Sequence, residues 1–358
     1  MPTLRLRDRD AIIAREGLIF RVFGYSHPPN AYICDAEYAP AELFKSDNPK
    51  APRNKGQQAF CKFYDDEGWR FIQNNFPQYL IFHDMLRQKT IGVNKKDLLE
   101  TRKPDEKLKE LVTKKPKDEL VNALRNVLAF TVKRSSLSVN DFGIFGSMLH
   151  DFHHPKFSDI DLTIYGRDKV ALMRETLQEL YRDYSSLLSN EFETDESIQG
   201  KRWRFQNLSP KEFIWHQRRK LIYALFHDKK SRRIIKTEFE PVRDWKEISS
   251  DYDPEVTIVR KGWVRMLARV SEDIDALFIP SVYGIEPLKV LDGAKGFLEV
   301  ARVVSYIEEF RMQAFAGETV YVEGNLEEVN ARKGSFHQIA LTYCPRYYEQ
   351  VLKVAHQA

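Results

Sequence analysis

The 358-residue sequence lacks several features that would place it in a specialised class of protein. It has only three cysteines, Cys34, Cys61 and Cys344, and they lie far apart. This argues against a disulfide framework or a cysteine-rich zinc site and favours a reducing compartment. No apolar run approaches the roughly 20 residues that a membrane helix needs, and no apolar stretch of signal-peptide length follows the charged N-terminal residues. We therefore expect a soluble, cytoplasmic protein without a membrane partner.

An overall excess of one charge is also missing, because 56 basic residues face 52 acidic ones and leave a net charge of +4. The local distribution is more informative. Residues 201–236 contain 12 Lys or Arg and two acids, so the rest of the chain carries a net charge of −6. Such a segment predicts a polyanionic partner, either a nucleotide or a nucleic acid. The alternative is an ordinary solvent-exposed helix face.

The length and the 42% of hydrophobic residues fit two or three domains with real cores. A charged, proline-interrupted connector at 101–119 marks the first boundary. We expect an N-terminal α+β module over 1–116, a central domain over 117–250 and a C-terminal α+β module over 251–358, the outer two rich in antiparallel strands. Five identities between 15–38 and 260–283 suggest that the outer modules are related. Unrelated strand pairs that share a turn would explain them equally well.

Apolar periodicity predicts the main elements of the central and C-terminal parts. Residues spaced by three and four indicate helices, whereas alternating residues indicate strands. We expect four helices: one beginning at Leu120, one capped by Asp168, one over 210–226 and one over 298–315. The expected strands cover 159–165 and 234–242. Helices and strands in this order indicate an α+β fold with a mixed central sheet.

One ordered set of residues carries recognisable chemistry. Gly146-Ser147 ends a short apolar strand, and Asp159 and Asp161 follow after a spacer. Two carboxylates at positions i and i+2 of a strand share a face and can hold a divalent cation. A glycine lets backbone N–H groups approach phosphate oxygens. The pattern therefore predicts a site for Mg²⁺, or Mn²⁺, and a nucleoside triphosphate.

In this motif the sequence resembles the nucleotidyltransferase superfamily of the DNA polymerase β type. The resemblance covers about 120–245 and rests on Phe145-Gly146-Ser147 and Ser158-Asp159-Ile160-Asp161-Leu162. More loosely, the whole chain resembles uncharacterised archaeal proteins described as predicted nucleotidyltransferases. Those proteins carry segments like 20–29 and 334–338 of this chain. The resemblance implies a central nucleotidyltransferase-type sheet.

The resemblance also implies a third carboxylate on a later strand, for which Glu238 is the first choice and Glu240 the second. Asp159, Asp161 and this glutamate would hold two Mg²⁺ or Mn²⁺ ions and transfer a nucleoside monophosphate from an NTP to an acceptor hydroxyl. We expect the acceptor to be an RNA 3′ end, tRNA included. A protein hydroxyl ranks second and a small molecule third.

Five basic residues are candidates for contacting the acceptor or the phosphates: Arg218, Arg219, Lys230, Arg232 and Arg233. A different class of function stays open, in which the fold is catalytically inert and binds nucleic acid. The position of the third carboxylate distinguishes the two hypotheses, because without it a second cation lacks a ligand. The histidines of the spacer, His150, His153 and His154, could bind a transition metal, but loop-tip positions or contacts to a substrate phosphate are the simpler interpretations.

Overall fold

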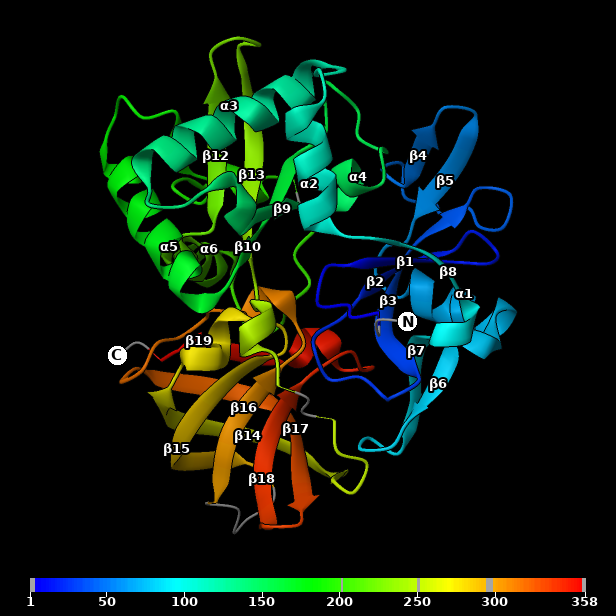
Figure 1. Ribbon diagram of the computed structural model, residues 1–358. Helices are drawn as coiled ribbons and strands as arrows, with labels where there is room; N and C mark the ends of the chain where they lie inside the picture. Colours follow the sequence, from blue (N-terminus) through cyan, green and yellow to red (C-terminus); the bar gives the residue numbers. More distant parts are fainter. Residues whose placement is uncertain (1–3, 201, 250–251, 294–298, 356–358) are drawn as a thin grey trace. The chain divides into compact units, whose positions relative to one another are not determined.

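A computed structural model describes residues 4–200, 202–249, 252–293 and 299–355. The fold is α+β, with more strand than helix (Figure 1). The chain divides into two compact units: Met1–His83, Gln88–Leu188 and Ala224–Tyr252 form the first, and Asp84–Arg87, Ser189–Tyr223 and Asp253–Ala358 the second. The first unit thus contains both the expected N-terminal module and most of the expected central domain.

The first unit begins with an antiparallel sheet. Its strands β8, β1, β2 and β3 lie side by side in that order, and β3 then pairs with both β5 and β7. Apolar side chains such as Ile12, Phe20 and Tyr79 fill its core. The elements are β1 (Ala11–Ala14), β2 (Ile19–Val22), β3 (Ala31–Pro40), β4 (Pro52–Lys55), β5 (Gln58–Lys62), α1 (Glu67–Asn75), β6 (Leu80–His83), β7 (Gln88–Asn94) and β8 (Leu98–Arg102).

A second, five-stranded sheet has the order β11-β12-β13-β10-β9. It is mixed, because β10 runs parallel to β13 and antiparallel to β9. Figure 1 shows α3 lying across β12 and β13. The elements are α2 (Pro104–Thr113), α3 (Glu119–Arg134), β9 (Phe142–Ile144), α4 (Gly146–Leu149), β10 (Ile160–Tyr165), α5 (Arg167–Arg182), β11 (Leu188–Asn190), β12 (Tyr223–Asp228) and β13 (Arg233–Val242).

Local sequence explains where these helices start. Asp118 caps α3, since its side chain accepts a hydrogen bond from the Val121 amide at 3.0 Å, and the apolar stripe that begins at Leu120 is buried as predicted. Pro104 opens α2 at its first position, where a missing N–H costs nothing. The cap of α5 is Gly166 rather than Asp168, which lies in the first turn of the helix. The acidic side chain there still faces the positive end of the helix dipole.

The second unit contains α6 (Pro210–Lys220) and a barrel of five strands. The strands follow one another as β14, β15, β16, β18 and β17, and β17 closes the ring by pairing with β14. Val264, Met266 and Tyr283 are among the residues that fill the interior. The strands are β14 (Thr257–Glu272), β15 (Ser281–Asp292), β16 (Val300–Ser305), β17 (Thr319–Ala331) and β18 (Gly334–Leu341), with β19 (Val351–Val354) paired to β17.

Two helix predictions in this unit need correction. The helix expected over 298–315 is wrong in its described part, where β16 and a short 3-10 helix at Glu308–Phe310 occur instead. Valines at 300, 303 and 304 mimic helical spacing but fit a strand between two partners. The helix expected over 210–226 ends at Lys220, because Leu221 adopts a left-handed conformation with φ of 54° and β12 begins at Tyr223.

The outer modules differ in topology. The C-terminal barrel contains a parallel pair, β16 with β18, whereas the pairings described for the N-terminal sheet are all antiparallel. The register differs too, since Ile19 pairs with Tyr38 but the matching Tyr283 pairs with Val303. The identities between 15–38 and 260–283 therefore do not correspond to one repeated strand arrangement.

A buried ionic segment, Arg7-Asp8-Arg9-Asp10, precedes β1, and each of the four residues is at most 4% exposed. The Arg7 guanidinium lies 3.6 Å from the ring centroid of Tyr165, at the end of β10. The Arg9 guanidinium pairs with the carboxylate of Glu240 on β13. Buried charges need such partners, because desolvation of an unpaired ion costs several kcal/mol. The segment therefore fastens the N-terminal sheet to the mixed sheet.

Asp10 makes the stability of this region dependent on pH. Burial raises the pKa of its carboxyl from 3.8 to about 7, although the Arg7 amide donates a hydrogen bond to it. The folded state therefore favours the protonated acid, and wild-type protein loses stability as the pH rises from about 4 to about 7. Above pH 7 we expect the free energy of unfolding of Asp10→Asn to exceed that of wild type by roughly 1–3 kcal/mol. Near pH 4 the two free energies should be equal.

Urea unfolding followed by circular dichroism across this pH range checks the prediction. Asp47→Asn, at an exposed position, is the matched control and should leave the pH profile unchanged. A profile for Asp10→Asn that stays parallel to wild type would contradict the assignment.

Candidate functional site

The predicted carboxylates meet on two neighbouring strands. Asp161 on β10 lies directly beside Glu238 on parallel β13, and Thr163 lies beside Glu240. Side chains two residues apart on a strand share a face, so Asp159, Asp161 and Glu238 project from the same side of the sheet. Asp159 is exposed, while Asp161 and Glu238 are half-buried. The strand register thus sets Asp161 beside Glu238, although 77 residues separate the two in the sequence.

Gly146 packs directly against the second of these carboxylates. Its φ is +62°, and a Cβ at this position would lie 2.3 Å from Oδ2 of Asp161. The adjacent Phe145 amide donates a hydrogen bond to the Asp161 carbonyl oxygen at 2.9 Å. Only glycine satisfies both the left-handed backbone and the close approach. Gly146 and Ser147, predicted to form a turn, instead begin the short helix α4, and Gly146 lies against Asp161.

The charges around Asp161 are predominantly negative. Burial first, and then repulsion from Asp159, raises the pKa of Asp161 to about 7. Glu240 and Glu37 add to this effect, whereas the Lys62 ammonium opposes it. A divalent cation would relieve the repulsion between neighbouring carboxylates. Even so, no group of three or more His, Cys, Asp or Glu side chains stands ready to hold a metal ion in the part of the chain that the structure describes.

The two candidates for the third carboxylate have different surroundings. Glu240 is 2% exposed and forms an ion pair with the buried guanidinium of Arg9. Glu238 is half-buried and is the register neighbour of Asp161. Glu238 is therefore the register neighbour of Asp161, whereas the Glu240 carboxylate is paired with a buried guanidinium.

Two histidines of the spacer, His150 and His153, have structural partners. His150 is fully buried; its Nδ1 accepts a hydrogen bond from Arg102 at 3.1 Å, and its Nε2 lies 3.6 Å from the Glu37 carboxylate. Burial lowers the pKa of His150. His153 instead contacts Asp118, the cap of α3, at 3.0 Å. The two side chains thus anchor the loop to different elements, as expected of loop residues rather than metal ligands.

Asp151 anchors the same loop through cations. Lys117 and Lys107 donate hydrogen bonds to its carboxylate at 2.6 and 2.9 Å, and Lys55 lies 3.9 Å away. Burial alone would raise the pKa of Asp151, but the hydrogen bonds from these lysines hold it well below its usual range. The spacer is therefore tied to β4 and to both ends of the connector between the two sheets.

The predicted basic residues fall into two groups. Arg218 donates hydrogen bonds to the carbonyl oxygens of Phe192 and Glu193, and Arg219 pairs with Glu318, all within the second unit. Both guanidiniums therefore have structural partners. In contrast, Lys230 and Arg232 lie in the turn between β12 and β13, and Arg233 is the first residue of β13, the strand that carries Glu238. All three belong to the first unit.

Residues from the N-terminal sheet also border the site, which sequence reasoning missed. Glu37 and Lys62 both act electrostatically on Asp161. Tyr38 packs its ring against His150 and Phe152, with centroids 5.4 and 5.1 Å apart. These residues lie more than 80 positions before the motif and belong to no recognisable pattern, so only the tertiary structure places them here.

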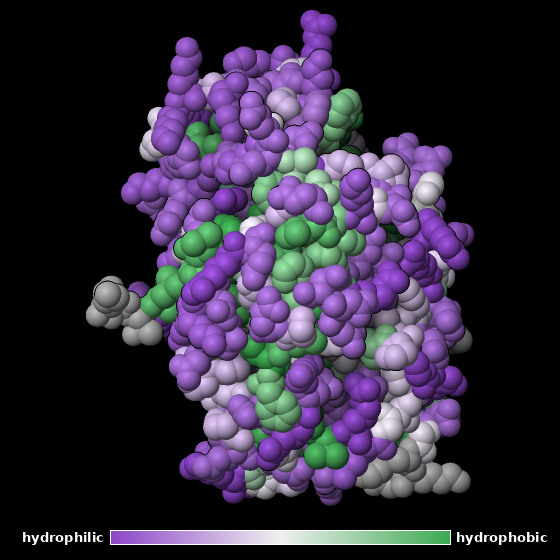
Figure 2. Space-filling model, turned by 90° about the vertical axis from the view of Figure 1, so that its right-hand side faces the viewer, coloured by the Kyte–Doolittle hydropathy of each residue, from purple (hydrophilic) through white to green (hydrophobic). Residues whose placement is uncertain are grey.

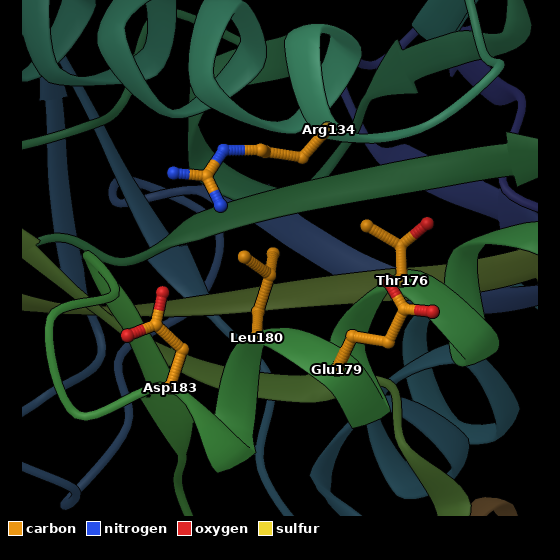
Figure 3. Close-up of a pocket in the computed structure, with 5 residues that line it drawn as sticks. All are labelled: Arg134, Thr176, Glu179, Leu180 and Asp183. Atoms are coloured by element: carbon orange, nitrogen blue, oxygen red, sulfur yellow. The ribbon is translucent and has the colours of Figure 1, made fainter.

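A pocket of about 230 Å³ lies elsewhere in the first unit, between α3 and α5. Figure 3 shows Arg134 pointing toward it from α3, opposite side chains of α5 and the turn that follows. None of the candidate site residues lines this pocket.

On the face drawn in Figure 2 most of the surface is hydrophilic, with some gathered hydrophobic residues. Within the described residues, no helix is long and apolar enough to cross a membrane.

Comparisons with known proteins give one full-length relative. The chain is 27% identical over 358 residues to the uncharacterized protein MJ1086 of Methanocaldococcus jannaschii. The alignment covers 98% of this chain and 99% of that protein. No family model matches the sequence. No solved structure matches it either. The comparisons therefore assign no activity, and any function has to be argued from the site.

Gly146→Ala tests the contact between the Gly-Ser turn and Asp161. We expect it to destabilise the protein by roughly 2–4 kcal/mol, since it adds left-handed strain and a steric clash. In the Asp161→Ala background the clash disappears, so the same substitution should cost about 1 kcal/mol from backbone strain alone. Thermal unfolding of the four proteins checks this double-mutant cycle. Equal costs in both backgrounds would show that the contact is not tight.

Proposed function

We propose that this protein is a metal-dependent nucleotidyltransferase that moves a nucleoside monophosphate from an NTP to the 3′ hydroxyl of an RNA. The observation that supports this most is the parallel pairing of β10 with β13, which sets Glu238 beside Asp161 while Gly146 contacts the Asp161 carboxylate. A mixed sheet that carries a Gly-Ser segment, an Asp-x-Asp strand and an acidic strand supports the proposal, because the family that the motif resembles combines these elements.

In this proposal each residue has a distinct role. Asp159 and Asp161 would hold Mg²⁺ or Mn²⁺, with Glu238 completing the carboxylate set. When bound, the cation would lower the pKa of the acceptor hydroxyl and offset the charge on the phosphates. The backbone of Gly146 and Ser147 would hold the phosphate groups of the NTP, and the Ser147 hydroxyl could donate a hydrogen bond to them.

The chemistry itself is an in-line displacement at the α-phosphorus of the NTP. The acceptor oxygen forms the new P–O bond, and the bond to the bridging oxygen breaks, so that pyrophosphate leaves. The carboxylates of Asp159, Asp161 and Glu238 would hold the cation, and Lys62 adds a positive charge that acts on Asp161. Positioning and charge stabilisation account for most of the acceleration in such reactions.

The second candidate is a catalytically inert fold that binds nucleic acid. The absence of a ready-made ligand group of three side chains among the described residues favours it. The two candidates differ in what a carboxylate substitution should do, because only the enzyme needs the acidic side chains for its activity.

Glu238→Gln and Glu240→Gln separate a catalytic carboxylate from a structural one. We expect Glu238→Gln to lower transfer at least about 100-fold, since it removes a charge at the site. Glu240→Gln should instead destabilise the protein, by roughly 1–3 kcal/mol, because it removes the closer of the two carboxylates beside the buried Arg9 guanidinium and leaves Asp8, at 3.6 Å, as the other. Transfer rates and thermal unfolding measured on both variants check this. Loss of activity with normal stability for Glu240→Gln would exchange the two roles.

A transfer assay tests the function itself. Each α-labelled NTP is incubated with the protein, Mg²⁺ or Mn²⁺, and either cellular RNA or lysate protein. Label should appear on RNA with wild type and be lost in the Asp159→Asn/Asp161→Asn variant. Label on protein would identify a protein-modifying transferase. No label on either, together with RNA binding that the variant retains, would favour the inert binding module.

A further inference from the structure

An exposed pair of aromatic rings lies in the loop directly before Asp159. The ring centroids of His154 and Phe157 are 4.5 Å apart, and their planes differ by 30°. Phe157 is 79% exposed, more than any other phenylalanine among the described residues. A large apolar side chain held at the surface beside a polar site forgoes the free energy of burial, which is about 2 kcal/mol for phenylalanine. Single exposed apolar residues are common on protein surfaces. What suggests a ligand here is that the exposed ring packs against a second ring directly before Asp159.

Hydrogen bonds within the turn hold the two rings in place. The His154 carbonyl oxygen accepts from the amides of Phe157 and Ser158, at 3.2 and 3.1 Å. In return, the Ser158 hydroxyl accepts from the His154 amide at 2.8 Å, and His154 Nδ1 accepts from the Lys156 amide at 3.1 Å. Because the rings are pre-organised, a ligand that stacks on them pays little ordering entropy.

The loop is attached to the strand that carries Glu238. The Arg233 guanidinium donates a hydrogen bond to the Pro155 carbonyl oxygen at 2.5 Å, at the start of β13. One residue further along β13, Ile234 is 62% exposed and, by the two-residue alternation, lies on the same face as Glu238. A second exposed apolar side chain therefore occurs on the face of the sheet that carries the carboxylates.

Exposed cations flank this apolar surface. Lys156 lies in the loop itself, and Lys230 and Arg232 lie in the turn that precedes Arg233. None of the three side chains forms an ion pair within the described ranges of the chain. Aromatic rings interleaved with unpaired cations are the features by which proteins bind single-stranded nucleic acid, since bases stack and phosphates pair with Lys or Arg.

We propose that the His154–Phe157 ring pair is the stacking platform for the terminal base of a single-stranded RNA acceptor, with Lys156, Lys230 and Arg232 contacting its phosphates. The proposal rests on the proposed function, because it orients the acceptor toward Glu238. The RNA strand is favoured over a free nucleotide for two reasons. The platform is tied to the strand of the third carboxylate rather than to the Gly-Ser turn, and three separate cations suit a chain of phosphates.

Binding of a fluorescently labelled single-stranded RNA to the full-length protein tests the platform. We expect Phe157→Ala to weaken binding about 5- to 100-fold, the range measured for loss of one base–aromatic stack. Phe157→Trp should bind like wild type. The matched control is Tyr184→Ala, which removes a fully exposed aromatic ring from the turn after α5 and should leave binding unchanged.

A second RNA, which lacks the 3′-terminal base, tests whether that base is the one that stacks on the platform. Wild type should bind this RNA as weakly as Phe157→Ala binds intact RNA. Phe157→Ala should bind the shortened RNA with no further loss of affinity. Independent, additive losses would overturn the proposal, as would intact RNA that binds Phe157→Ala normally. Weaker binding of NTP alone, with RNA binding unaffected, would also overturn it and assign the platform to the nucleotide base.

The assay separates this inference from the catalytic proposal. Binding is measured without NTP or divalent cation and is repeated in the Asp161→Asn background, so it needs no transfer activity. A Phe157-dependent RNA site in a protein that transfers nothing would uphold the platform and refute the enzyme. Normal transfer to RNA by Phe157→Ala, with an unchanged KM for the RNA, would refute the platform and uphold the enzyme.

Discussion

The buried ion pair between Arg9 and Glu240 is the constraint on which the candidate site depends. It joins a segment before the first strand to β13, and neither partner is more than 3% exposed. Removing Glu240 would leave Asp8, at 3.6 Å, as the other carboxylate beside Arg9, and we expect a cost of roughly 1–3 kcal/mol. The pair also holds Glu240 on β13, two residues after Glu238. The parallel register of β10 and β13 sets Glu238 beside Asp161.

The N-terminal sheet is consequently part of the site. It contributes Glu37 and Lys62 to the electrostatic surroundings of Asp161, and it holds the spacer loop through His150 and Tyr38. The spacer in turn carries both the Gly-Ser turn at one end and the exposed rings of His154 and Phe157 near the other. A loop fixed at several points can present both ends to the same face of the sheet without paying the entropy of ordering on binding.

Much of the central part was predictable because its signals are local. The strand at 159–165, the strand at 234–242 and the apolar stripe from Leu120 follow from periodicity alone, and the α+β class is confirmed. The expected helix over 298–315 is wrong because valines spaced by three satisfy a helix template while a strand between two partners decides their conformation. The basic residues Arg218 and Arg219 read as ligand contacts in sequence, yet their guanidiniums bind carbonyl and carboxylate oxygens of the protein.

Spacing along one or two adjacent elements encodes the Gly146-Ser147 segment, the Asp-x-Asp strand and the acidic strand, so all three could be predicted from the sequence. The tertiary structure sets Glu238 beside Asp161 through the parallel register of β10 and β13, and it pairs Glu240 with a guanidinium more than 200 residues away. It also decided that Glu37 and Lys62 border the site. Contacts between distant segments arise from packing and buried charge, and neither leaves a periodic trace in the sequence.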